Sequence, residues 1–175
     1  FSLKGYTSIL IGIYIIIGAY AIQFILDGFL IDVSPMGMMS TEIIEVLIIA
    51  TVGLVFVFSF FALFFKGRRE AKNFDYKLWN GKTKTAFWKC LLSLIAIFYL
   101  LIVLKNLGFI NYITPVLLAL YGALLVILKN KERKNILVLS GLCVLLAILC
   151  LLIPNYWYSS FCIVGLAHIT YGVVV

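Results

Sequence analysis

The stretch FWKCLLSLIAIFYLLIVL, residues 87–104, contains a single charged side chain, Lys89, among its eighteen residues. An α-helix needs about 20 predominantly apolar residues to cross the hydrocarbon core of a bilayer. The stretch lacks the alternation of polar and apolar residues that is typical of a strand. Backbone groups exposed to lipid must form hydrogen bonds within their own segment, as they do in a helix. The stretch therefore predicts a transmembrane helix.

Comparable apolar stretches recur along the whole chain. Together with the first there are six, at about 7–26, 43–65, 87–104, 110–128, 136–153 and 156–175. Hydrophobic residues make up 65% of the 175 residues and charged residues 12%, about half the charged fraction of an average soluble domain. The six stretches leave no room for a soluble domain. We therefore predict an all-α polytopic membrane protein, in which residues 1–175 form a single transmembrane domain of three antiparallel helical hairpins.

The basic residues are distributed unevenly over the linkers. Thirteen of the fourteen fall before the first stretch or near the second and fourth linkers, and Lys105 is the exception. The thirteen are Lys4, Lys66, Arg68, Arg69, Lys72, Lys77, Lys82, Lys84, Lys89, Lys129, Lys131, Arg133 and Lys134. Short loops rich in Lys and Arg remain on the cytoplasmic side of a membrane. The pattern predicts that both termini and the loop 66–86 face the cytoplasm, in a bacterial plasma (inner) membrane.

The loop 66–86 is the longest linker of this arrangement. We expect its basic side chains to contact lipid headgroups, namely Arg68, Arg69, Lys72, Lys77, Lys82 and Lys84. A basic group near an anionic leaflet contributes about 1 kcal/mol, so we interpret the net charge of +7 as attraction to membrane lipids. Nucleic acid is excluded as a partner because the charges are spread over short loops. The spacing of Ala71, Phe74 and Leu78 fits a short interfacial helix, and an irregular basic loop is the alternative.

Small and polar residues form stripes at helical spacing in three of the stretches. The stripes are Gly5, Ser8, Gly12, Ala19 and Gln23 in the first stretch, Ser140, Cys143, Ala147 and Cys150 in the fifth, and Gly165, His168 and Gly172 in the sixth. Transmembrane helices associate through close packing of small residues and through interhelical hydrogen bonds. We predict that the three stripes meet in the interior of the bundle. The packing residues expected there are Gly12, Ala19, Gln23, Ala147, Gly165 and Gly172.

Aromatic residues are abundant, at 15% of the chain. Trp79, Phe87 and Trp88 fall at the expected inner boundary of the membrane, where amphipathic rings are enriched. The second stretch carries a run of phenylalanines, Phe56, Phe60, Phe61, Phe64 and Phe65. This run is either a lipid-facing surface or a docking surface for another membrane protein. We favour lipid, because apolar surface inside a bilayer requires no protein partner.

His168 is the only histidine of the chain and lies inside the sixth stretch. An ionisable residue within a membrane span is a hypothesis for a functional site, here a proton relay, a quinone contact or a ligand of a pigment metal. The alternative is a neutral imidazole hydrogen-bonded to a neighbouring helix. We favour the alternative because the sequence supplies no carboxylate deep within a span as a partner for His168, whereas proton pathways chain several Asp, Glu or His residues.

No other pattern indicates catalysis, a cofactor or a metal. Four carboxylates gather near the first outer loop, Asp27, Asp32, Glu42 and Glu45, but their spacing matches no calcium-binding loop. The four cysteines show no C-x-x-C spacing, and a disulfide between Cys150 and Cys162 is conceivable without being indicated. We therefore predict no enzymatic activity, no cofactor and no metal site.

Three segments carry a resemblance to a known family. They are LIGIYIIIGAYAI (10–22), LLIPNYW (151–157) and IVGLAHITYG (163–172), and they resemble the HdeD-like acid-resistance membrane proteins. The resemblance implies three repeated helical hairpins and a small stress-related inner-membrane protein without known catalysis. The chain departs from this pattern in its long acidic first outer loop and its large loop 66–86. No functional residue can be carried over from the family.

Together these observations favour a non-catalytic integral membrane protein. It would be a structural or accessory subunit in contact with other integral membrane subunits or with copies of itself, or a small stress-associated protein. The alternative is a small-solute or proton transporter or channel with His168 in its path. Transport sites need polar groups near the middle of the membrane, where this sequence is almost entirely aliphatic.

Overall fold

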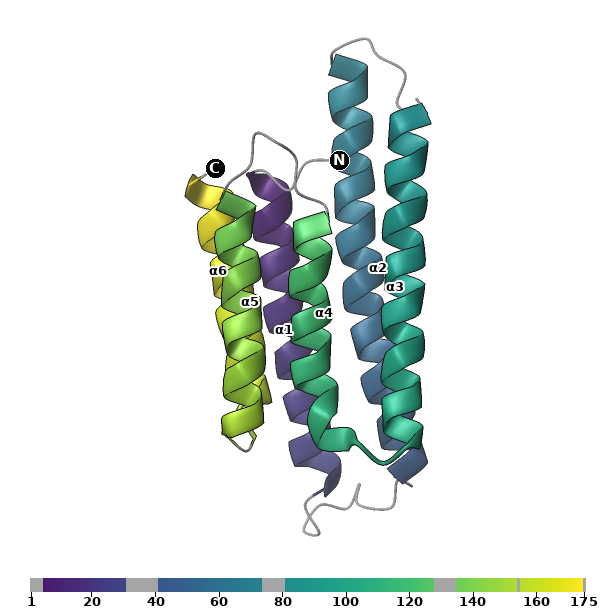
Figure 1. Cartoon of the computed structure of the whole chain (residues 1–175), viewed down its shortest axis with the longest axis vertical. Helices are drawn as coiled ribbons and strands as arrows, with labels where there is room; N and C mark the ends of the chain where they lie inside the picture. Colours follow the sequence, from purple (N-terminus) through teal and green to yellow (C-terminus); the bar gives the residue numbers. More distant parts are fainter. Residues whose placement is uncertain (1–4, 31–40, 74–80, 128–134, 154, 175) are drawn as a thin grey trace. The chain divides into compact units, whose positions relative to one another are not determined.

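The computed structural model describes residues 5–30, 41–73, 81–127, 135–153 and 155–174. Within these residues the chain forms six α-helices and one short 3-10 turn, η1 (Figure 1). Their bounds are α1 (Tyr6–Leu30), α2 (Thr41–Asn73), α3 (Gly81–Asn106), η1 (Ile110–Tyr112), α4 (Ile113–Ile127), α5 (Asn135–Leu152) and α6 (Trp157–Val174). The prediction of an all-α protein with six helices is confirmed.

Four of the helices are long and apolar enough to cross a membrane. The candidate spans are Tyr6–Gly28, Ile43–Arg69, Phe87–Asn106 and Trp157–Val174. The apolar helices Ile113–Ile127 and Ile136–Leu152 are shorter. Fifteen residues of α4 extend over about 22 Å at 1.5 Å per residue, less than the roughly 30 Å of a typical hydrocarbon core. By helix length and hydropathy, the chain is a multi-pass integral membrane protein.

The ends of α2 and α3 differ from the predicted loop 66–86. α2 continues through the basic residues to Asn73, and α3 begins at Gly81. Hydropathy reports where a helix leaves the hydrocarbon, whereas Lys, Arg, Glu and Ala are all good helix formers and let a helix continue into water. The interfacial helix expected around Phe74 and Leu78 lies largely outside the described residues, and its Ala71 belongs to α2.

Gly108 ends α3 and begins the tight connection to α4. Its φ of 80° lies in the left-handed region that favours glycine. The amide of Phe109 donates to the carbonyl of Leu104 at 3.0 Å, and the amide of Gly108 donates to the carbonyl of Lys105 at 2.9 Å. These paired bonds are those of a Schellman motif, which satisfies the last carbonyls of a helix.

The described structure divides into two compact units. The middle unit comprises Gly67–Ser160, and the terminal unit comprises Ser2–Lys66 and Phe161–Val175. The middle unit therefore contains α3, α4 and α5, and the terminal unit contains α1 together with most of α2 and α6. The prediction of a single transmembrane domain stays a prediction.

In the middle unit, α4 packs on α5 through a face that includes a glycine. Leu118, Gly122 and Leu125 are buried on α4 at intervals of four and three residues, and so lie on one side of the helix. A Cβ atom at Gly122 would lie 3.2 Å from the carbonyl oxygen of Ser140 and 3.4 Å from the Cβ of Cys143. The hydroxyl of Ser140 donates to the carbonyl oxygen of Gly122 at 2.8 Å. The polar stripe of α5 thus contacts α4 through an interhelical hydrogen bond.

Removal of this bond is expected to weaken the α4–α5 pair. Ser140→Ala should lower the free energy of unfolding by about 1 kcal/mol, a typical value for an interhelical hydrogen bond in a membrane protein. Ser93→Ala is the control, because the hydroxyl of Ser93 bonds only its own helix, at the carbonyl of Lys89. The measurement is reversible unfolding in mixed micelles, followed by circular dichroism. Equal stabilities of the two variants would contradict the expected contribution of the Ser140 bond.

Candidate functional site: the crossing of α1 and α6

The first and last helices approach each other closely in the terminal unit, at three levels. Gly12 faces Gly165, Ser8 faces His168, and Gly5 faces Gly172. We call these six residues the α1–α6 crossing. Rising numbers on α1 pair with falling numbers on α6, so the two helices are antiparallel. The levels are separated by three or four residues on each helix, which places them one turn apart on a single face.

The backbones meet most closely where Gly12 faces Gly165. A Cβ atom built at Gly12 would clash with the carbonyl oxygen of Gly165. A Cβ atom built at Gly165 would lie 2.8 Å from the carbonyl oxygen of Gly12 and 2.5 Å from Cγ1 of Ile16. Because both clashes involve backbone oxygen, rotation of a side chain cannot relieve them. Only glycine fits at these two positions with the helices at this separation.

A second close approach lies at the start of α1. A Cβ atom built at Gly172 would lie 2.7 Å from the carbonyl oxygen of Gly5 and 2.9 Å from the amide nitrogen of Ile9. Gly5 has a φ of 59° and its carbonyl accepts the amide of Ser8 at 3.0 Å, which opens the first turn of α1. The end of α6 therefore packs against the first turn of α1.

Between the two glycine contacts, Ser8 and His168 are both 0% exposed. The Ser8 hydroxyl donates to the backbone carbonyl of His168 at 2.8 Å, and its oxygen lies 3.2 Å from Nδ1 of the same residue. A hydroxyl has one proton and two acceptor positions. Since the proton is directed at the carbonyl, Ser8 presents a lone pair to Nδ1, so we assign the proton of a neutral imidazole to Nδ1.

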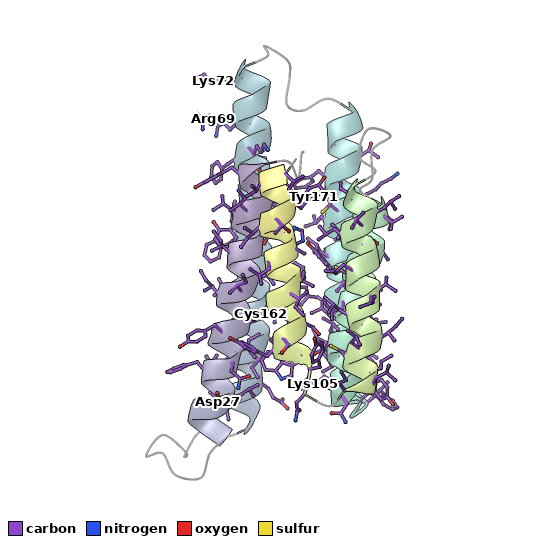
Figure 2. The ribbon with its side chains drawn as sticks, turned by 90° about the vertical axis from the view of Figure 1, so that its left-hand side faces the viewer. Asp27, Arg69, Lys72, Lys105, Cys162 and Tyr171 are labelled. Carbon is purple, nitrogen blue, oxygen red and sulfur yellow. The ribbon has the colours of Figure 1, made fainter. Side chains whose placement is uncertain are left out.

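The other expected packing residues lie as follows. Ala19 is buried on α1 and Ala147 is buried on α5. Gln23 donates its amide to both carboxylate oxygens of Asp27, at 2.8 and 2.9 Å, so this interaction stays within α1. Figure 2 shows Asp27 near the end of α1. The structure therefore brings the stripes of the first and sixth stretches together, and it places Ser140 and Cys143 of the fifth stripe against Gly122 of α4. The meeting of all three stripes stays a prediction.

Several contact residues were missed by the sequence reasoning. Thr7 and Tyr171 are buried beside the crossing positions Ser8 and Gly172, and Figure 2 labels Tyr171 on α6. Gly122 receives the Ser140 bond, and the hydroxyl of Ser160 lies 3.0 Å from the sulfur of Cys150. The sequence could have indicated Gly122 as a packing position, because it lies three residues from Leu125 and four residues from Leu118 and so shares a helix face with them.

The remaining candidate groups can be located only in part. Arg68, Arg69, Lys72 and Lys84 are exposed, and Figure 2 shows Arg69 and Lys72 near the end of α2. Lys77 and Asp32 lie outside the described residues, as do the side chains of Lys82 and Glu42. Cys90, Cys143, Cys150 and Cys162 are free thiols. Among the described residues, no three His, Cys, Asp or Glu side chains are grouped so as to hold a metal ion.

Comparison with protein-family models, with curated proteins and with solved structures finds no match. The resemblance to the HdeD-like proteins therefore stays a prediction. What the α1–α6 crossing can do follows from its own geometry: it joins the first and last helices through three levels of close contact and buries the only histidine between them.

Proposed function

We propose that the chain is a non-catalytic membrane protein that acts as a structural or accessory subunit of a membrane complex. The observation that carries the proposal is the environment of His168, the only histidine of the chain. This residue is fully buried and lies between two glycine contacts. The Ser8 hydroxyl contacts both its imidazole ring and its backbone carbonyl. An intramembrane imidazole is thereby used to fix the packing of two helices.

A transport role would require a different environment for His168. A proton relay or a substrate contact must be reached from an aqueous pathway lined by polar groups. At the crossing, His168 is fully buried and bonded to Ser8, and the glycines on either side of it pack against the aliphatic side chains of Ile169 and Ile16. A small-solute or proton transporter with His168 in its path is therefore the second candidate, favoured only by the ionisable character of the residue.

For the topology, we infer six crossings in three hairpins, with both termini in the cytoplasm of a bacterial cell. The alternation of basic and non-basic linkers supports this orientation. The antiparallel crossing of α1 and α6 agrees with it, because an even number of spans directs the first and last helices oppositely. The shorter α4 and α5 can still be accommodated, since a bilayer thins locally around a short span at modest cost.

The partners that fit this proposal are membrane lipids and other integral membrane subunits, or further copies of the chain. The exposed phenylalanines of α2, Phe58, Phe61 and Phe65, offer a surface for either lipid or protein. On the HdeD-like interpretation, the chain is a small stress-related inner-membrane protein without known catalysis.

The test is the mass and composition of the particle that a mild detergent releases from native membranes. Co-purification with other membrane subunits in fixed stoichiometry is the expected result for an accessory subunit. A lone monomer would contradict that role. In that case, proton and solute flux into vesicles should be compared for the wild type and His168→Asn, and loss of flux in a folded variant would support the transporter instead.

A further inference from the structure

α3 presents one continuous exposed face from its basic end to beyond its middle. Lys84, Trp88, Leu92, Ile95 and Tyr99 follow at intervals of four, four, three and four residues, so they lie above one another on the same side of the helix. Lys84 is exposed, and the exposed fractions of the other four side chains range from 51% at Trp88 to 70% at Tyr99. We call these five residues the α3 face.

The polar end of this face lies at the boundary of the membrane span. The span of α3 begins at Phe87, which places Lys84 one turn outside it and Trp88 just inside. Lys89 is also exposed, and its long apolar stem allows the ammonium group to reach the interface. No residue of α3 is acidic, so the positive charge of these lysines is not neutralised along their own helix.

Trp88 is held in place by its neighbour in the sequence. The rings of Phe87 and Trp88 meet edge to face, with centroids 6.2 Å apart and planes at 90°, a favourable arrangement for aromatic pairs. An indole at a membrane boundary presents an apolar body to the acyl chains and an N–H donor to the headgroup region. The indole therefore offers a hydrogen-bond donor one turn from Lys84 and next to Lys89 in the sequence.

We propose that the α3 face binds an anionic glycerophospholipid. The ammonium groups of Lys84 and Lys89 would hold the phosphate, and the indole N–H of Trp88 would donate to a phosphate or ester oxygen. One acyl chain would lie along Leu92, Ile95 and Tyr99. Phe87 and Tyr99 are twelve residues apart, about 18 Å along the helix, which matches the roughly 15 Å of hydrocarbon in one leaflet.

This inference names the class of lipid and the residues that select it. Charge complementarity separates the α3 face from ordinary lipid-facing surface, which would accept zwitterionic and anionic lipids equally. The inference needs only that α3 crosses a bilayer, so its failure would leave the proposed accessory role untouched.

The experiment measures which lipid lies against Trp88. The full chain carrying Trp79→Phe and Trp157→Phe, in which Trp88 is the only tryptophan, is placed in vesicles of equal parts phosphatidylglycerol and phosphatidylcholine. Brominated acyl chains, which quench indole fluorescence on contact, are carried by one lipid or by the other. We expect stronger quenching by the brominated phosphatidylglycerol, and we expect the preference to fall about fivefold for each of Lys84→Gln and Lys89→Gln.

Lys105→Gln is the matched control, because it removes a lysine from the opposite end of the same helix and should leave the quenching unchanged. Equal quenching by the two lipids in the parent protein would overturn the proposal. Absence of quenching by either lipid would also overturn it, since Trp88 would then be covered by protein. As a second measurement with the native tryptophans, lipid mass spectrometry of the purified wild type should show more phosphatidylglycerol than the Lys84→Gln, Lys89→Gln variant retains.

Discussion

Gly12→Ala should lower the free energy of unfolding by about 3 kcal/mol, near the upper end of the usual range for overpacking a tight interface. The added methyl group would clash with the carbonyl oxygen of Gly165 and would lie 2.8 Å from Cγ1 of Ile169 and 3.1 Å from Cβ of His168. Ile169 can rotate away, but the carbonyl oxygen and the Cβ atom of His168 move only with α6. The substitution must therefore separate the two helices, which also lengthens the bonds between Ser8 and His168.

The matched control for this prediction is Gly141→Ala on α5. A Cβ atom at Gly141 would meet nothing within 4 Å, so the same chemical change adds no steric conflict. Alanine is the better helix former by about 0.5–1 kcal/mol, and the control should therefore be neutral or slightly stabilising. Unfolding in mixed micelles gives both values. A Gly12→Ala protein as stable as the Gly141→Ala protein would mean that α1 and α6 do not approach each other as closely as the structure has them.

The six helices could be predicted from the sequence because each contains a long apolar run, which only lipid can solvate at this density. The continuation of α2 through Arg68, Arg69 and Lys72 to Asn73 could not. Transfer into water ends an apolar run without ending the helix, since Lys and Arg keep high helix propensity. A helix end requires a local signal, and Gly108 after α3 supplies one.

The faces of the crossing could also be found from the sequence, because the spacing of Gly5, Ser8 and Gly12 gathers them on one side of a helix. The choice of partner could not. Any stripe of small residues can pack against any other. From the sequence alone, the stripe of α5 that contains Ser140 and the stripe of α6 that contains His168 were therefore equally suitable partners for α1. In the structure the Ser140 hydroxyl bonds Gly122, on the helix that precedes α5 in the chain. Pairing depends on which helices are neighbours, and periodicity within one helix holds no such information.

His168→Ala is expected to lower the free energy of unfolding by about 2–4 kcal/mol, because a buried side chain is replaced by a cavity. The Ser8 hydroxyl keeps its bond to the carbonyl of residue 168, which belongs to the backbone, but its oxygen loses the donor at Nδ1. The loss therefore combines packing with the hydrogen bond to Ser8, and a second substitution is needed to separate these two contributions.

His168→Asn makes this separation. The amide nitrogen of asparagine is attached at the same distance along the side chain as Nδ1 of histidine, so it can donate to the oxygen of Ser8. We expect Asn to recover about 1 kcal/mol relative to Ala, the value of one interhelical hydrogen bond, whereas Gln, whose amide lies one bond further out, should not. In a Ser8→Ala background the advantage of Asn over Ala should disappear.

Equal stability of the His168→Asn and His168→Ala variants would contradict the donor role assigned to Nδ1. Because asparagine cannot titrate, unchanged proton flux into vesicles in a stable His168→Asn protein would show that the imidazole serves packing rather than proton transfer.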